Sequence, residues 1–328
     1  METCEQMRKL RFLTTLLVFM VGCNSTPIKE GDRKMIPEIR YSSTWADPIF
    51  PLTLSIDTSG MASLSVGTNL DNPDLGAVGV FGQKLDNEQL ADLVAALRSR
   101  DFINIQNPKS ALPGEAVREL CIKEEGQGEL EKWISFHNPA SSVFLKVEEK
   151  ALVLVNLVRQ HPISAMTMKV GFPLEQLDRG KPIEFSVTII NPGSESVQVP
   201  HPNTWLKRNV QLQMIGLRSN IPLEQLEDYH QRFEELSEVH LLKIQGTKVA
   251  KPLIAILPGE RLVFTFRINL DWPPGQYDLR ISFVSPLLNR EGVMQLDCQL
   301  ISKPHAIKII GKSKPGDEPE QLDEGEDS

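Results

Sequence analysis

The sequence predicts an α+β domain, an antiparallel sheet with two helices, followed by an all-β sandwich. Apolar and polar residues alternate in short runs along most of the chain, which is typical of strands buried on one face. Apolar residues take helical spacing at two places in the first half. Strand pairs with a few helices favour an α+β domain, and a later series of about seven short strands favours a sandwich.

The chain opens on a basic and then apolar stretch, RKLRFLTTLLVFMVGCNST, at residues 8–26. Its apolar run, Phe12 to Val21, is shorter than the roughly 20 residues that a helix needs to cross a bilayer. Basic residues before a short apolar run, with small residues after it, are typical of a secretory signal peptide. We therefore expect residues 1–22 to be a signal peptide that is removed.

The end of this stretch, MVGC, resembles the signal of bacterial membrane lipoproteins, although Met20 stands where that family usually has Leu. The resemblance implies cleavage before Cys23, diacylglycerol on its thiol and an acyl chain such as palmitate on its amino group. It implies a lipid-anchored protein of the bacterial cell envelope, outside the cytoplasm. In that family Asp after the Cys favours the inner membrane, so the resemblance, with Asn24 at this position, implies the outer membrane. The alternative is a plain secretory leader in which Cys23 is incidental.

Residues 23–46 are polar, contain prolines and show no sustained apolar period, so we expect a flexible tether. The α+β domain is predicted at residues 47–162. Alternation in LTLSIDTSGMASLSV predicts a hairpin. A first helix is predicted at LDNEQLADLVAALRSR, where Asp86 and Gln89 fit a capping box. A second helix is predicted at about residues 147–160, with Leu152, Val155 and Val158 in the core.

The sandwich is predicted at residues 163–311, where alternating runs are bounded by Pro, Gly and Asn. Two stretches, GKPIEFSVTIINPGSESVQV and LPGERLVFTFRINLDWPPGQYDLRISF, resemble bacterial immunoglobulin-like (Ig-like) domains, including the intracellular proteinase inhibitor type. The resemblance implies an Ig-like sandwich. Helical spacing in IPLEQLEDYHQRFEELSEVHLL predicts an inserted helix. Residues 312–328 are predicted to be an acidic, disordered tail. Within it, residues 315–328 carry seven acids and no base, so they supply −7 of the net charge of −8.

The sequence offers few groups for chemistry. Motifs for a nucleophilic serine, a phosphate-binding loop or a dinucleotide are absent from it, so we predict no enzyme and no cofactor. Glu227, His230 and Glu234 could hold a metal, but a solvated helix face is the stronger interpretation, and we predict no metal site. Without a basic stripe we predict no nucleic-acid binding. Cys121 and Cys298 are expected to be separate buried thiols.

Two tryptophans in loop contexts, Trp205 and Trp272, are candidates for a binding surface, although filling the ends of the sandwich core is the favoured alternative. The anchor and the modular architecture predict a membrane-anchored lipoprotein with a non-catalytic binding or envelope-structural role. Its partners would be membrane lipid, through acylated Cys23, and an envelope protein of unknown identity. The alternatives are an extracytoplasmic hydrolase with an interdomain site and a proteinase inhibitor.

Overall fold

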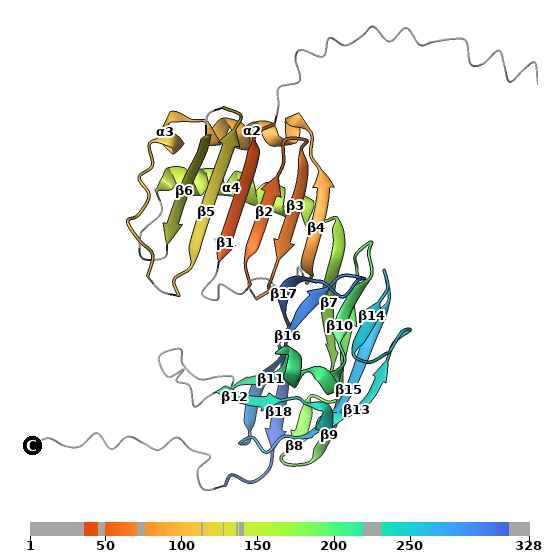
Figure 1. The fold of residues 1–328 in the computed structure, drawn as a ribbon. Coiled ribbons are helices and arrows are strands. Elements are labelled where there is room, and N and C mark those ends of the chain that lie inside the picture. The colour runs from red at the N-terminus through yellow and green to blue at the C-terminus, as the bar shows by residue number, and fades with distance from the viewer. Residues whose placement is uncertain are drawn as a thin grey trace, which may run out of the picture. The chain divides into compact units, whose positions relative to one another are not determined.

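The computed structural model describes residues 36–44, 50–70, 76–112, 114–126, 128–135, 137, 141–218 and 231–314. All of them belong to one of two compact units, residues 36–328 (Figure 1). The signal peptide, Cys23, most of the tether and residues 315–328 of the tail lie outside the described residues. The described chain is mostly β with large antiparallel sheets, which confirms the coarser part of the predicted fold class. Within the described part no helix is both long and apolar enough to cross a membrane.

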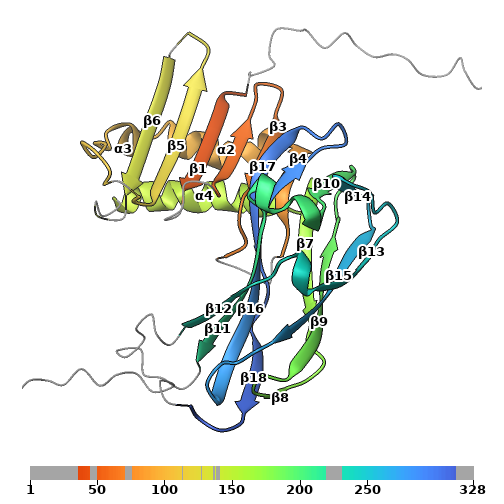
Figure 2. The ribbon, with the colours of Figure 1, turned by 60° about the horizontal axis from the view of Figure 1, so that its bottom comes forward.

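The first half of the unit is built on six antiparallel strands in the order β4-β3-β2-β1-β5-β6. The strands are β1 (Glu38–Thr44), β2 (Leu52–Ile56), β3 (Met61–Val66), β4 (Val78–Lys84), β5 (Val117–Glu124) and β6 (Gly128–Ser135). Three helices, α2 (Asn87–Leu97), α3 (Arg100–Ile103) and α4 (Ser142–Val158), lie on one face of this sheet (Figures 1 and 2).

The helices form where the sequence predicts capped amphipathic segments. The Asp86 side chain accepts from the backbone N–H of Gln89, and the Gln89 side chain accepts from the backbone N–H of Asp86, so the capping box is confirmed. The apolar face of α2 is buried in a core cluster with that of α4 and the facing side of the sheet. Helix α4 begins at Ser142, about one turn before the predicted start, and Leu152, expected in the core, is 38% exposed.

The predicted tether is wrong at its C-terminal end, because residues 38–44 form strand β1. This strand lies between β2 and β5 in the sheet and buries Ile39 and Tyr41. The alternation in EIRYSST is short and its inward positions include serine, so the apolar period is weak in the sequence. Pairing on both sides stabilises the strand despite that weak pattern.

The second half contains two sheets whose apolar faces share one core cluster, and their strand pairs are antiparallel except for the parallel pair of β8 and β18. One is β13-β15-β9-β7; the other is built around β16, flanked by β11 and β10 on one side and by β17 and β18 on the other. The strands are β7 (Pro162–Gly171), β8 (Gln176–Asp178), β9 (Pro182–Ile190), β10 (Val197–Pro200), β11 (Gln211–Arg218), β12 (Gln231–Glu235), β13 (Leu241–Gln245), β14 (Leu253–Ile256), β15 (Arg261–Asn269), β16 (Gly275–Leu288), β17 (Met294–Ile301) and β18 (His305–Ile310).

Strand β7 belongs to both halves. Its first residues pair with β4, and the residues from Thr167 onwards pair with β9, so ten strands form one continuous sheet. The predicted boundary between residues 162 and 163 falls at the start of this shared strand.

The predicted inserted helix is wrong for the described residues 231–242. This segment contains strand β12, a short 3₁₀ helix at Glu238–His240 and the start of β13. Alternate residues of β12 are exposed while its backbone pairs with β11, and this pairing overrides the helical spacing of Phe233 and Leu236. Residues 221–230, the rest of the prediction, lie outside the described residues.

Candidate functional site

A polar groove of about 850 Å³ lies in the second half of the described chain. We call it the loop groove. It lies where loops follow β9, precede β15 and join β16 to β17, and Lys248 closes another side. A second hollow of about 610 Å³ is lined by residues from two of the same segments. Its lining residues Thr247 and Gly259 directly adjoin the groove residues Lys248 and Pro258 in the sequence. Side chains from segments far apart in the sequence therefore meet at one place.

Asn191 fixes the walls of the loop groove. Its buried side-chain amide donates to the backbone oxygens of Glu195 (2.7 Å) and Ile256 (2.9 Å). Its side-chain oxygen accepts from the N–H of Gly193 at 2.8 Å. The backbone of Asn191 also exchanges hydrogen bonds with Gly259 and Glu260 in the facing turn. One buried asparagine thus holds two loops together, and a side chain at Gly193 would collide with the Ile163 carbonyl.

The hairpin that joins β16 to β17 is also held in place. The Asn289 side chain accepts from the N–H groups of Glu291 and Val293, at 3.1 and 2.9 Å. Gln198 of β10 donates to the carbonyl of Arg290 at 2.8 Å. The hairpin is therefore fixed against β10, and this side of the groove is preorganised.

Charges of both signs line the loop groove. Lys248 and Arg290 are exposed, and among the described residues neither forms an ion pair. Glu195 and Glu291 provide carboxylates nearby. The arrangement offers hydrogen-bond donors, acceptors and both charges to a ligand, which suits a polar chain better than a small apolar molecule.

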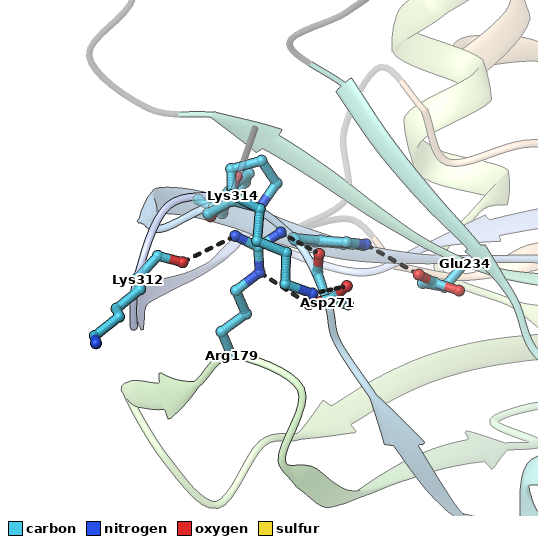
Figure 3. A network of polar contacts seen from close by, with 8 residues as sticks. Arg179, Glu234, Asp271, Lys312 and Lys314 are labelled. Atoms are coloured by element: carbon cyan, nitrogen blue, oxygen red, sulfur yellow. Dashed lines mark hydrogen bonds and ion pairs between the residues drawn. The ribbon is translucent and has the colours of Figure 1, made fainter. Parts of the chain in front are cut away.

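A second polar cluster lies where β8 and β18 end, and Figure 3 shows its side chains. The Arg179 guanidinium, whose side chain is only 8% exposed, donates to the Asp271 carboxylate at 2.8 Å and to the Lys312 carbonyl at 3.1 Å. Lys314 contacts both carboxylate oxygens of Asp271. Lys314 and then Arg179 lower the pKa of Asp271. This network ties residues 312–314 to the sandwich, so we assign it a structural role.

A buried charge lies between α4 and the first sheet. Glu148 accepts from the Tyr41 hydroxyl at 2.9 Å and from the Arg118 guanidinium at 2.6 Å, and its side chain is 4% exposed. Burial raises the pKa of Glu148, and Arg118 partly offsets this rise. Sequence reasoning missed the cluster. The available signal was the position of Glu148 four residues after Phe144 and three before Ala151, on the apolar face of the helix.

The tryptophans proposed as a binding surface are core residues. Trp205 and Trp272 are each 4% exposed, so the suggestion of exposed recognition anchors is wrong and core packing is confirmed. Each indole N–H is satisfied internally, by the Pro200 carbonyl at 3.0 Å and by Glu234 at 3.1 Å. The two indole rings can be buried because their N–H groups find hydrogen-bond acceptors inside the protein.

The structure describes both cysteines of the folded part and one of the three candidate metal ligands. Cys121 and Cys298 are free and buried, as expected, and burial raises the pKa of the Cys121 thiol to about 12. Glu227 and His230 lie outside the described residues, whereas Glu234 lies in β12. Among described residues no cluster of three or more His, Cys, Asp or Glu could hold a metal ion.

Comparison with known proteins places the chain in no family. No family model and no curated protein matches it. It is similar to the putative ApaA protein from Bordetella pertussis (16% identity, 45% of this chain, 97% of that one, TM-score 0.26). It is also similar to AvmM, described as catalysing macrocyclization in alchivemycin A biosynthesis (12% identity, 46% of this chain, 92% of that one, TM-score 0.26). A third similar structure is the CARDB domain of PF1109 from Pyrococcus furiosus, in complex with di-metal ions (13% identity, 44% of this chain, 87% of that one, TM-score 0.22). Similarities this low carry no argument about function.

Proposed function

We propose that the protein is a lipoprotein of the bacterial cell envelope, anchored through acylated Cys23, with a non-catalytic binding role. Its second half, residues 163–311, acts as an Ig-like domain that presents the loop groove to a protein partner. The observation that carries this proposal is the groove itself, a hollow of about 850 Å³ whose loops are fixed by buried and backbone-directed hydrogen bonds.

The rigidity of the loops supports a binding role. Ordering a flexible loop on association costs free energy, and loops that are already fixed avoid this cost. Binding residues are commonly carried by loops that a rigid scaffold positions. The Asn191 turn and the Pro258-Gly259 turn also belong to the stretches that resemble Ig-like domains, which supports the Ig-like assignment.

The polarity of the groove supports a protein partner. Lys248 and Arg290, which form no ion pair with any residue that the structure describes, line the groove together with Glu195 and Glu291. The groove can therefore form hydrogen bonds and ion pairs with both signs of charge. A protein surface presents backbone and charged groups in such a mixture, and interfaces between proteins use about one hydrogen bond per 100–200 Å².

The groove can be tested by photocrosslinking in the living cell. A photocrosslinking amino acid at position 248 or 290 should capture a discrete envelope protein, because both side chains line the groove. The same amino acid at position 181 is the control, since Lys181 is exposed at the start of β9 whereas the groove follows the end of β9. Equal capture from all three positions, or none from 248 and 290, would reject a protein partner in the groove.

The anchor has its own test. Mass spectrometry of the mature protein should find an N-terminus at Cys23 that carries diacylglycerol and an amide-linked acyl chain. The Cys23→Ala variant should leave the membrane fraction, since two or three acyl chains supply the anchoring and the variant has none. Retention of residues 1–22, or an unmodified Cys23 in the wild-type protein, would reject the lipoprotein assignment while leaving the groove proposal standing.

A further inference from the structure

Strand β6 is a long, regular edge. It ends the ten-stranded sheet, and all eight of its residues pair with β5 without a shift of register. The outer side of such a strand presents unpaired backbone groups, which can pair with a strand of another chain. The opposite edge is different, since β13 has five residues and a register shift between Leu241 and Lys243. A bulge of this kind already disfavours pairing, so β6 is the edge that needs protection.

A segment that follows α3 occupies the outer side of β6. The Asn107 side chain donates to the Glu131 carbonyl at 3.1 Å and accepts from the Trp133 N–H at 3.2 Å. These two backbone groups flank Lys132, and one residue of a neighbouring parallel strand would bond the same pair. The carboxamide therefore takes the place of a strand residue. Pro108 comes next and has no N–H, so the segment cannot continue as a strand along this edge.

Lys132 adds a second contact from the strand itself. Its ammonium group donates to the Ile105 carbonyl at 2.6 Å, so a side chain of β6 also holds the segment against the strand. We propose that residues 104–107 and Lys132 form an edge guard, which prevents β6 from pairing with β6 of a second copy of this chain.

A second copy is the occupant because β6 is complementary to itself. Antiparallel pairing centred on Lys132 would place Leu130 opposite Ile134 of the other copy. Ile134 belongs to the apolar core cluster, and Leu130 packs against that cluster. The same register would place the two Lys132 ammonium groups opposite each other. Like charges directly opposite are destabilising, so Lys132 opposes the pairing and Asn107 blocks it.

The test compares Asn107→Ala, the double variant Asn107→Ala/Lys132→Ala and the control Gln106→Ala. Gln106 lies in the same segment, but its side chain contacts only the nearby Asn104 carbonyl, at 3.4 Å. Amide hydrogen exchange at Trp133 should become about tenfold faster in Asn107→Ala and stay unchanged in Gln106→Ala. By sedimentation velocity between about 10 μM and about 1 mM, the double variant should form dimers where the wild-type protein and Gln106→Ala keep one mass.

Two results would overturn the edge guard. A Trp133 amide that exchanges in the wild-type protein as fast as an unprotected one would show that Asn107 does not bond β6. A double variant that loses Trp133 protection, keeps the wild-type circular dichroism spectrum and still matches the wild-type mass at every concentration would show that β6 needs no guard.

Discussion

Replacing Arg118 by Met is expected to lower the free energy of unfolding by about 3 kcal/mol. Glu148 is 4% exposed at its side chain, and Arg118 is the cation that its carboxylate contacts, at 2.6 Å. Removing one partner of a buried pair leaves an uncompensated charge, which costs about 3–5 kcal/mol. The partial exposure of Arg118, 39%, places the expected effect at the lower end of this range.

The defect should depend on pH in a defined direction. Burial raises the folded-state pKa of Glu148 above its value in the unfolded chain, so protonation of this carboxyl favours the folded state. Without Arg118 the pKa rises further, because the offsetting cation is gone. The loss of stability in Arg118→Met should therefore be largest near pH 8 and shrink towards about pH 5, as the carboxyl takes up its proton. Urea unfolding across this range measures the change.

A surface ion pair supplies the matched control for Arg118. Arg98 contacts Glu124 at 2.5 Å, but the two side chains are 50% and 23% exposed. Replacing Arg98 by Met should cost at most about 1 kcal/mol, with little dependence on pH in the same range. Equal effects of the two substitutions would contradict the role assigned to the buried carboxylate.

Replacing Trp205 by Ala is expected to cost about 3–5 kcal/mol of unfolding free energy, because the indole is 4% exposed and its removal leaves a large cavity. Its ring contacts those of Phe264 and Phe283, with centroids 5.7 and 6.1 Å away. The loss of the bond to the Pro200 carbonyl adds to the cost. Thermal or urea unfolding measures the effect.

The neighbouring residue is the control for Trp205. Leu206 is 94% exposed, so Leu206→Ala should change the free energy of unfolding by no more than about 0.5 kcal/mol. If Trp205 were a recognition anchor, Trp205→Ala would weaken partner binding and leave unfolding unchanged. That outcome would restore the interpretation that burial has overturned.

Local signals in the sequence predicted much of the architecture correctly. The capping box at Asp86 and the alternating strands depend on interactions within a few residues, and such interactions are visible in the order of side chains. The signal at β1 was weak because its inward positions mix apolar residues with serine. The signal at residues 231–242 was misleading, since apolar spacing close to 3.6 also fits a short strand joined to a 3₁₀ turn.

The candidate site was much harder to predict. The loop groove combines side chains from Glu195, Lys248 and Arg290, which are separated by tens of residues and share no motif. The bond from the Asn191 side chain to the Ile256 carbonyl depends on which loops meet in the folded chain. Glu148 had a local signal, whereas its partners Tyr41 and Arg118 lie on strands far away in the sequence.

The sequence by itself therefore determined the strand and helix types of most segments, because these depend on patterns within one stretch of chain. For the same reason the leader and the acylation site at Cys23 could be predicted from it, and they stay predictions. Only the tertiary structure decided that Trp205 and Trp272 are core residues, that β7 continues from one half into the other, and that Asn107 covers β6. The physical reason is that burial, strand pairing and hydrogen-bond partners are set by residues distant in the sequence, and a single stretch of chain does not contain them.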